Sequence, residues 1–414
     1  MNRRHTGLSI KSVRWLVCVS LCLLAIKSGC TNTPSGEPVA EHPHEATKEM
    51  GKEAVVPDPA QEVTPPEEPK PEPVVEKKPE KIEHIDPYTL TIFDKTRINS
   101  YGKVNFQKAD SPLSIKGSSF QKVELEVELA STCYPFEKWR SNPPPSGQNW
   151  PADCDAYDRN FEISLDPKKE DTDPPAFELM RAITPFGGPM KLKINVTDIF
   201  NGIDTSKEHT VRVRITTWPD GKGKVSGSKG GWTVSAKLHF TPGEAPKKVL
   251  AAIPLVYHSY KNTSGEVKVD FEVPEGTTRS YLTYTVTGHG GGTADSACIG
   301  HADEFCKREH TVMMDGKEVF KITPWRTDCQ NYCTLRPHPL APGRQYCLEN
   351  PCGAISSVRA PRANWCPGSY TPPFFLKNGV QNLAAGKHSF SYKIANVADK
   401  GSWKVSAIFY ALGN

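Results

Sequence analysis

Apolar and polar residues alternate along several parts of the chain, as they do in strands with one buried face. Val123, Leu125, Val127 and Leu129 alternate with glutamates. The same period of two occurs at residues 211–215, 267–273, 390–394 and 403–409. Because successive side chains of a strand point to opposite faces, we predict half-buried β-strands in these segments.

Turns rich in glycine and proline separate the alternating segments, at residues 187–189, 219–221, 288–292 and 385–386. No stretch keeps a period of 3.6 residues, so we expect few helices. Many short strands with such turns favour an all-β fold of sandwiches or jelly rolls. The strand-rich part is large for one sandwich, and the polar segment 241–248 leads us to predict two domains, at residues 88–243 and 244–414.

The first residues have the pattern of an export signal. Basic side chains within residues 3–14 precede an apolar stretch, 15–26, that is too short to span a bilayer. Ser28-Gly29-Cys30 follows and resembles a bacterial lipoprotein cleavage site, although Lys27 stands where an apolar residue is usual. We predict a signal peptide at residues 1–29 and a lipid anchor, including palmitate, at Cys30. Ordinary cleavage and secretion is the alternative.

Both alternatives place the mature protein outside the cytoplasm. With the anchor, the membrane is a partner through Cys30, and the protein is an outer-membrane or cell-surface lipoprotein of the cell envelope.

Residues 31–87 contain no aromatic side chain and hold 12 of the 37 prolines. Such a segment cannot bury enough apolar surface to order itself, so we predict a disordered linker over residues 30–87.

Composition narrows the classes of partner. Lysine and arginine number 51 and aspartate and glutamate 47, a net charge of +4, which argues against a nucleic-acid binder. The chain has neither a glycine-rich phosphate loop nor a Gly-x-Ser-x-Gly motif, and we expect no cofactor. Nine of the 12 cysteines follow Cys30. We expect them to form disulfides, because an exported protein is in an oxidising compartment. Nine is an odd number, so one thiol stays free or pairs between chains.

Residues 154–159 crowd two carboxylates, an aromatic ring and a cation into one segment. If Cys133 and Cys154 are bridged, the loop between them is held and Asp158 has a fixed position. A buried carboxylate beside a substrate can act as a general base. The alternative is that Asp158 only caps a loop at the end of a strand.

A second segment runs from Cys298 to Cys306 and includes Glu304. A small disulfide loop between these cysteines would present Glu304 rigidly. The competing interpretation is a metal site made by His289, His301 and His310, but their spacings match no zinc motif. Four cysteines also suggest a zinc knuckle, although export favours disulfides: Cys329, Cys333, Cys347 and Cys352.

A third segment, residues 359–368, places two arginines beside a tryptophan. Arg362 and Trp365 suit a sugar face or a carboxylate. The alternative is that Trp365 packs over a disulfide.

These three segments, in this order, resemble the peptide-N-glycosidase F family. Residues 154–159 are similar to its Cys-Asp-x-Trp-Asp-Arg segment, and Glu304-Phe305-Cys306 is similar to its Glu-Trp-Cys. Thr217-Trp218 matches a Thr-Trp pair, and residues 362–368 are the closest local match. The family hydrolyses the amide between asparagine and the first GlcNAc of N-linked glycans. The resemblance therefore implies N-glycans or glycopeptides as substrates.

The resemblance also implies a fold and residue roles. It implies two adjacent eight-stranded jelly-roll domains with an active site in the cleft between them. Asp158 matches the catalytic aspartate that activates water, and Glu304 matches a supporting catalytic glutamate. We expect substrate-binding positions at Asp155, Tyr157, Arg159, Thr216, Trp218, His289, Arg362 and Trp365. We expect disulfides that involve Cys133, Cys154, Cys298, Cys306, Cys329 and Cys366.

Three departures from the family pattern bear on activity. Thr216 occupies the position of a second glutamate, and a threonine carries no charge near neutral pH. Losing such a group costs roughly 10–1000-fold in rate. Tyr157 replaces a tryptophan before Asp158, and His289 stands where another tryptophan is expected.

We therefore predict an exported amidase that acts on N-linked glycoproteins or glycopeptides. One alternative is a lipoprotein of the same fold that binds glycan or peptide without turnover. A second is a metal-dependent monooxygenase-like protein. The double jelly roll resembles the architecture of the copper monooxygenases that hydroxylate peptidylglycine.

Overall fold

The structure, a computed structural model, describes residues 85–102, 105–167, 175–218, 220–291 and 295–414. These residues belong to one compact unit. The predicted signal peptide, Cys30 and most of the predicted linker lie outside the described residues. Within the described ranges, no helix combines the length and the apolar character needed to cross a membrane.

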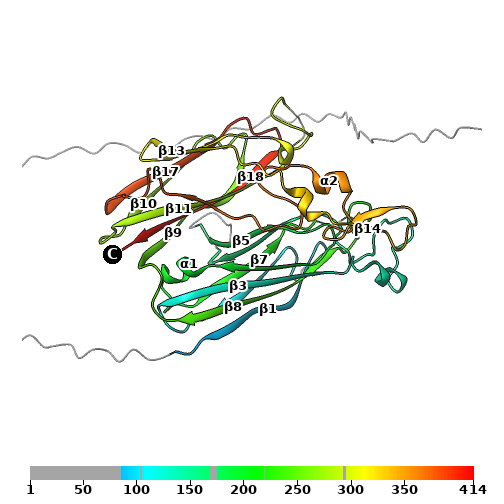
Figure 1. Ribbon diagram of the computed structural model, residues 1–414, viewed down its shortest axis with the longest axis horizontal. Coiled ribbons are helices and arrows are strands. Elements are labelled where there is room, and N and C mark those ends of the chain that lie inside the picture. The colour runs from blue at the N-terminus through cyan, green and yellow to red at the C-terminus, as the bar shows by residue number, and fades with distance from the viewer. Residues whose placement is uncertain (1–84, 103–104, 168–174, 219, 292–294) are drawn as a thin grey trace, which may run out of the picture. The chain divides into compact units, whose positions relative to one another are not determined.

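The first half of the described chain folds as a sandwich of two four-stranded antiparallel sheets (Figure 1). One sheet has the order β1-β8-β3-β6, with strands Tyr88–Asn99, Gly231–Pro242, Phe120–Ser131 and Met190–Asn195. The other has the order β2-β7-β4-β5, with strands Lys108–Leu113, His209–Ile215, Asn160–Leu165 and Phe177–Ile183. This strand order is that of a jelly roll.

The second half repeats the arrangement with eight further strands. Its first sheet has the order β9-β18-β11-β16, with strands Val249–Lys261, Gly401–Leu412, Arg279–Gly290 and Phe374–Leu376. Its second has the order β10-β17-β12-β13, with strands Val267–Val273, Gly386–Ile394, His310–Met314 and Lys317–Ile322. The predicted all-β fold of two adjacent jelly-roll sandwiches is confirmed. The domain limits at residues 88–243 and 244–414 stay a prediction.

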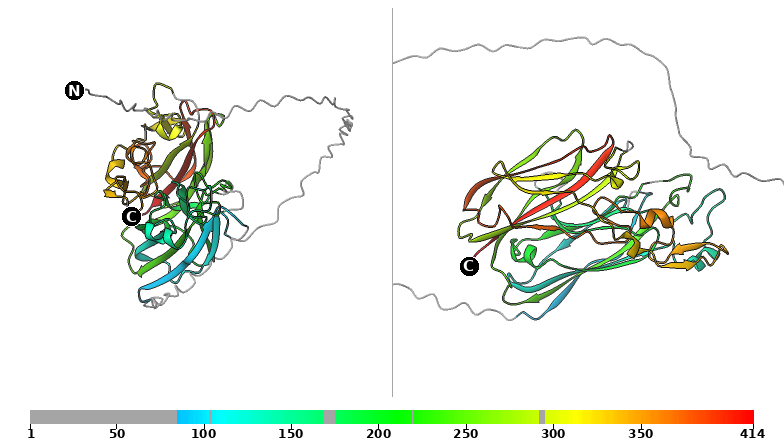
Figure 2. Two further views of the ribbon diagram at one scale, coloured as in Figure 1. Left: turned by 90° about the vertical axis from the view of Figure 1, so that its right-hand side faces the viewer. Right: turned by 45° about the horizontal axis from the view of Figure 1, so that its top comes forward.

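Helical and irregular segments in the described residues are short. The α-helices are α1 (Thr197–Asn201) and α2 (Ile355–Arg359), and the 3-10 helices are η1 (Phe136–Arg140), η2 (Asp303–Phe305) and η3 (Cys329–Tyr332). A two-stranded sheet of β14 (Leu335–Pro337) and β15 (Gln345–Cys347) lies in the long insertion between β13 and β16. This insertion and α2 lie at one end of the view in Figure 1, and the left panel of Figure 2 faces that end.

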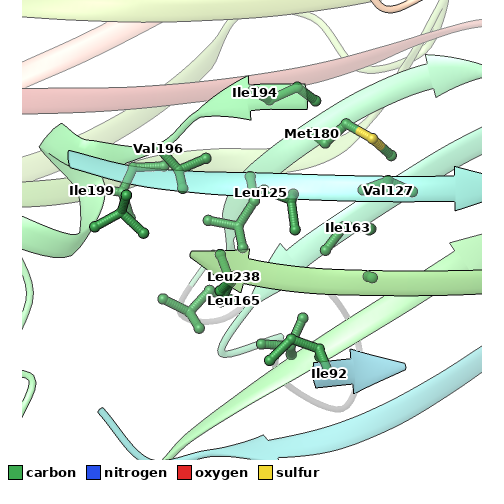
Figure 3. Close-up of a cluster of buried hydrophobic side chains, with 14 of the residues drawn as sticks. Ile92, Leu125, Val127, Ile163, Leu165, Met180, Ile194, Val196, Ile199 and Leu238 are labelled. Carbon is green, nitrogen blue, oxygen red and sulfur yellow. The ribbon is translucent and has the colours of Figure 1, made fainter. Parts of the chain in front are cut away.

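The core of the first sandwich follows the predicted alternation. Val123, Leu125, Val127 and Leu129 of β3 are buried, and the glutamates between them point away from this core. Figure 3 shows Leu125 close to Leu238 of β8, its partner in the strand register. Burial of these side chains stabilises the sandwich by roughly 25 cal/mol per Å² of apolar surface removed from water.

Strand β18 departs from the simple alternation because nearly all of its side chains are buried. Trp403, Val405 and Phe409 pack in the core of the second sandwich. Ile408 and Tyr410, on the opposite face, pack with the first core. The sheet that contains β18 is therefore covered on both faces, one of them by the other sandwich.

Polar contacts cross between the two sandwiches. Glu162 of β4 accepts a hydrogen bond from Tyr257 Oη of β9 (2.6 Å), and its carboxylate lies 3.6 Å from Lys404 Nζ of β18. Arg181 of β5 donates to the backbone oxygen of Lys404 (2.7 Å). Burial works to raise the pKa of Glu162, but the charges of Lys404 and Arg181 outweigh it and lower the pKa to about 2. The carboxylate is therefore ionised and paired at this interface.

The nine cysteines of the described residues form four disulfides and leave Cys352 as a free thiol. The predicted participation of six cysteines in disulfides agrees with the bridges Cys133–Cys154, Cys298–Cys306 and Cys329–Cys366. The fourth bridge joins Cys333 to Cys347. The alternative of a zinc knuckle is wrong in this structure, because three of its four cysteines are consumed by disulfides.

Candidate active site

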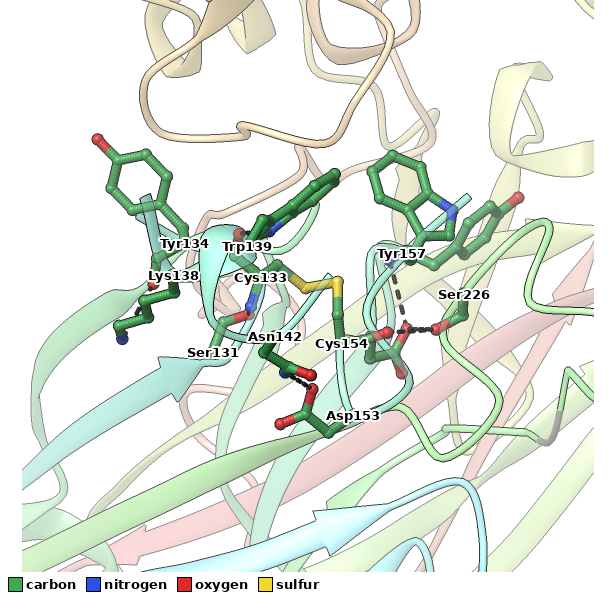
Figure 4. Close-up of a disulfide and its surroundings, with 12 residues drawn as sticks. Ser131, Cys133, Tyr134, Lys138, Trp139, Asn142, Asp153, Cys154, Tyr157 and Ser226 are labelled. Carbon is green, nitrogen blue, oxygen red and sulfur yellow. Dashed lines mark hydrogen bonds between the residues drawn. A yellow bond between two sulfur atoms is a disulfide. The ribbon is translucent and has the colours of Figure 1, made fainter. Parts of the chain in front are cut away.

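The loop that carries Asp158 is held from several sides. The Cys133–Cys154 disulfide fixes its start, as Figure 4 shows. Asp155 is fully buried and accepts hydrogen bonds from Arg159 Nε and Nη2 (3.1–3.2 Å) and from Ser226 Oγ (2.9 Å). Thr184 Oγ1 accepts a hydrogen bond from the backbone of Arg159 (2.8 Å), immediately before β4. Asp158 therefore projects from a rigid segment.

Glu304 lies in η2, within the Cys298–Cys306 bridge. Its neighbour Asp303 is fully buried and accepts hydrogen bonds from Arg308 Nε (2.8 Å) and Trp403 Nε1 (3.2 Å). The backbone oxygen of Glu304 accepts a hydrogen bond from the amide of Ala363 (2.8 Å). These contacts tie the glutamate to the core of the second sandwich and to the segment that carries Arg362.

Arg362 joins the two carboxylates. Its Nη1 lies 2.9 Å from Glu304 Oε1, and its Nη2 lies 3.7 Å from Asp158 Oδ2. Its guanidinium carbon lies 4.6 Å from the ring centroid of Phe305 and 4.4 Å from that of Trp365. The guanidinium is thus held between two aromatic rings, and it brings together two acids that are far apart in the sequence.

Asp158, Glu304 and Arg362 line one cavity of about 320 Å³. Its other lining residues come from both sandwiches and include Trp150, Tyr157, Phe186, Val225, Cys352 and Ser357. The size and the mixed apolar and polar lining suit the binding of a small ligand or of part of a larger one.

An aromatic and cationic group lies beside this cavity. The guanidinium carbon of Arg159 lies 4.9 Å from the ring centroid of Tyr157 and 4.3 Å from that of Trp218. Both rings are partly exposed, whereas Arg159 is buried. Tyr157 lines the cavity. The ring of Trp218 packs against the ring of Tyr157, with 6.2 Å between their centroids. These exposed rings offer flat surfaces to a ligand.

Burial perturbs both carboxylic acids of the cavity. Burial raises the pKa of Asp158 to about 7, with the charge of Arg362 acting in the opposite direction and that of Glu304 in the same direction. Burial also raises the pKa of Glu304, and Arg362 again opposes the shift. A carboxyl group with a pKa near neutrality is suited to exchange protons during a reaction.

Six sequence-predicted residues do not line this cavity: Asp155, Arg159, Thr216, Trp218, His289 and Trp365. Asp155 is buried and paired with Arg159, so it supports the loop. Trp365 is only 2% exposed, and its Nε1 donates to the backbone oxygen of Gly288 (2.8 Å), so it supports Arg362 instead of presenting a face to ligand. His289 stacks on Trp365 at 5.4 Å between centroids. Thr216 is exposed next to the aromatic group.

The three histidines proposed as metal ligands do not gather. Among the described residues, one group of cysteine, histidine or acidic side chains has its ligand atoms within reach of a common ion, and it consists of Cys133, Cys154 and Cys352. Two of these sulfurs form a disulfide. His310 Nδ1 instead lies 3.1 Å from Tyr284 Oη in a buried position.

Sequence reasoning did not identify several residues that shape the cavity. Ser357 of α2 accepts hydrogen bonds from Arg362 Nη2 through its backbone oxygen (3.0 Å) and its hydroxyl (2.9 Å). Phe305 and Phe186 supply apolar surface around Arg362 and Tyr157. Phe305 adjoins Glu304 and could have been included for that reason, whereas no local pattern distinguishes Ser357.

Comparison with known proteins gives two sequence matches. The family model described as peptide-N-glycosidase F, C terminal, matches residues 257–410. The peptide-N(4)-(N-acetyl-beta-D-glucosaminyl)asparagine amidase F of Elizabethkingia miricola is 25% identical over 279 residues, which cover 63% of this chain and 68% of that protein.

Solved structures share the fold. PNGF-II has a TM-score of 0.57 at 22% identity and covers 78% of this chain, and this chain spans 65% of PNGF-II. PNGase F, described as a glycosylasparaginase from Flavobacterium meningosepticum, has a TM-score of 0.53 at 19% identity and covers 80% of this chain and 97% of its own.

Fold and site thus define a protein of two stacked jelly rolls with a paired-carboxylate cavity between them. The sequence matches show that this chain is similar to peptide-N-glycosidase F, with the C-terminal family model matching residues 257–410. The family resemblance seen in the sequence is confirmed.

Proposed function

We propose that the protein is an amidase that hydrolyses the bond between asparagine and GlcNAc in N-linked glycoproteins or glycopeptides. One observation carries the proposal: Arg362 contacts Glu304 at 2.9 Å and lies 3.7 Å from Asp158 in a shared cavity. Similarity to a named asparagine amidase, 25% identical over 279 residues, supports the same reaction.

In the proposed reaction, Asp158 is the general base. It takes a proton from a water molecule, whose oxygen then bonds to the carbonyl carbon of the asparagine side chain. The bond from that carbon to nitrogen then breaks as the proton held by Asp158 passes to the nitrogen, which leaves an aspartate in the peptide and an amine on the released glycan. Glu304 and Arg362 hold the base and the water in place, and Arg362 keeps part of Asp158 ionised.

The substitution Asp158→Asn tests the proposal. It keeps the shape of the side chain and removes the base, so we expect glycan release to fall by about 10²–10⁴-fold. The assay uses a denatured N-glycoprotein and measures both free glycan and conversion of asparagine to aspartate. Asp153→Asn is the matched control, because Asp153 lies in the same loop and accepts a hydrogen bond from Asn142 outside the cavity.

Equal activity of Asp158→Asn and the unchanged protein would contradict the assignment of the base. The absence of any release by the unchanged protein would contradict the amidase itself.

Binding of glycan or peptide without turnover is the second candidate function. It is favoured by Thr216, an uncharged side chain at a position that corresponds to a glutamate in the family resemblance. Thr216 adjoins the Thr217-Trp218 pair, and Trp218 packs on Arg159 and Tyr157. Saturable glycan binding without product, together with activity gained by Thr216→Glu, would select this function.

We also propose that the protein is exported and anchored through Cys30 in the cell envelope. The basic, apolar and small residues of positions 3–30 support this proposal. Labelling of growing cells with a palmitate analogue tests it, and Cys30→Ser should abolish incorporation and release the protein from the membrane fraction. Labelling that persists in Cys30→Ser would contradict the anchor.

A further inference from the structure

A second cavity lies between the two sandwiches, away from Asp158. Its volume is about 380 Å³, and it shares no lining residue with the cavity of Asp158 as the structure describes them. Its walls come from β5, from the segment of β6 and α1, from β11 and β18, and from residues 370–375. Figure 3 shows Met180, Ile194, Val196 and Ile199, which separate this cavity from the first core.

The charged groups of this cavity are paired within its wall. Arg181 Nε and Nη2 lie 2.7 and 2.8 Å from the two carboxylate oxygens of Glu178. Lys247 Nζ pairs with Asp198, which also accepts a hydrogen bond from Tyr281 Oη (2.5 Å). Two cations thus balance two anions, so the wall favours a ligand without net charge.

Aromatic rings line part of the cavity. Tyr281 stacks on Tyr410 at 4.5 Å between centroids and an interplanar angle of 8°. Phe375 lies 6.1 Å from Tyr281 and is 62% exposed. Burial raises the pKa of both tyrosines, so their hydroxyls stay neutral at any physiological pH. The exposed ring of Phe375 is a surface on which the apolar face of a ligand can stack.

Thr371 supplies an unpaired polar group to the same cavity. It lines the cavity and is only 1% exposed, and its backbone amide donates to the oxygen of Arg181 (2.9 Å). Its hydroxyl has no hydrogen-bond partner among the described residues. A buried hydroxyl without a partner costs free energy, which a ligand hydroxyl would recover by bonding to it.

We propose that this second cavity binds a neutral sugar residue, separately from the Asp158 cavity. A pyranose has an apolar face that stacks on an aromatic ring and hydroxyls that exchange hydrogen bonds with threonine, carboxylate and guanidinium groups. Its lack of charge matches the balanced wall. The proposal does not depend on the amidase, because the two cavities have separate lining residues.

The test is a titration of the purified full chain in its Asp158→Asn form with neutral sugars, observed by NMR or calorimetry. The probes are N-acetylglucosamine, mannose and lactose, with glucuronate as the charged comparison. We expect saturable binding of at least one neutral sugar in the millimolar range, and weaker binding of glucuronate. Use of Asp158→Asn keeps this outcome separate from any turnover.

Three variants locate the binding site. Thr371→Val replaces the hydroxyl by a methyl group, and Phe375→Ala removes the exposed ring; each should weaken binding by about tenfold. Thr371→Ser keeps the hydroxyl and should bind like the parent. Because Phe375 is exposed, its variant stays informative even if Thr371→Val folds poorly.

Three results would overturn the proposal. They are no saturable binding of any neutral sugar, unchanged affinity in both Thr371→Val and Phe375→Ala, and loss of binding in Glu304→Gln. The last result would place the sugar in the Asp158 cavity.

Discussion

Arg362 connects the chemistry of the candidate active site to its packing. Its charge lowers the pKa of Asp158 and of Glu304, while burial raises both. The rings of Phe305 and Trp365 and the hydrogen bonds to Ser357 hold the guanidinium in one orientation. The balance between burial and one fixed cation therefore sets the protonation of the proposed base.

The pH dependence of activity follows from the pKa of Asp158. As a base, Asp158 acts only when ionised, and its pKa is about 7. We expect kcat/KM to rise as the pH increases through about 7 and to level off above it. A pH–rate profile of glycan release checks this, and a plateau that already begins near pH 5 would contradict the raised pKa.

Removal of the Arg362 charge should move that profile. In Arg362→Met the lowering influence on Asp158 is lost, so the midpoint should shift to higher pH and the plateau rate should fall. Arg362→Lys is the control, because it keeps the charge but cannot span both carboxylates, so its rate should fall with a smaller change of midpoint. An unchanged midpoint in Arg362→Met would show that burial alone sets the pKa.

The same pKa predicts an effect on stability. Asp158 has an ordinary pKa of 3.8 and a folded-state pKa of about 7, so folding favours the protonated form. Its contribution to stability is full below pH 3.8 and is lost as the pH rises through 7. Asp158→Asn should therefore raise the Tm at pH 8 and change it little at pH 4. A lower Tm of the variant at pH 8 would contradict this sign.

The sequence identified the charged residues of the site but not the side chains that hold them in place, such as Ser357 beside Arg362. The segments that carry Asp158, Glu304 and Arg362 were recognised from their clustered charged and aromatic residues and their family resemblance. Their meeting in one cavity depends on the packing of two sandwiches, which no local pattern encodes. Trp365 was expected to face a ligand, because the sequence does not reveal that Arg362 and His289 cover its ring.

At the scale of elements, alternation identified strands with one solvated face. It described β3 correctly, since Val123 and Leu125 are buried and the intervening glutamates are not. It could not show that the polar face of β18 is buried, because Lys404 and Ser406 lie against the other sandwich. The five-residue helices α1 and α2 escaped detection since they are too short to establish a helical period.

The Cys133–Cys154 disulfide should stabilise the loop that carries Asp158. It closes a loop with a sequence separation of 21, for which chain entropy gives about 3 kcal/mol. We expect the double substitution by serine to lower the free energy of unfolding by this amount and to reduce glycan release. Urea unfolding and the release assay measure the two effects.

Those measurements belong in a Cys352→Ser background, because the three sulfurs lie within 4.8 Å of one another. Cys352→Ser alone is the control and should retain the bridge. Equal unfolding free energies with and without the bridge would contradict its stabilising role.

At the scale of the whole molecule, a buried network couples the two sandwiches. Arg181 pairs with Glu178 and donates across the interface to the backbone of Lys404. Arg181→Met leaves the Glu178 carboxylate buried without its partner, so we expect a loss of about 3–5 kcal/mol in the free energy of unfolding. Chemical denaturation measures this loss.

The double variant Arg181→Met/Glu178→Met removes both charges, and it should recover much of the lost stability. A double variant less stable than Arg181→Met would show that Glu178 stabilises the fold without Arg181.

The two sandwiches have the same strand order but meet through non-equivalent sheets, β2-β7-β4-β5 of the first and β9-β18-β11-β16 of the second. Such a head-to-tail contact could in principle be repeated into a row, unlike a symmetric contact, which closes on itself. The two terminal faces bear solvated charges, with Glu128 and Lys191 on one and Lys268 and Asp270 on the other. Dehydrating these charges costs free energy, which opposes the packing of a further sandwich on either face.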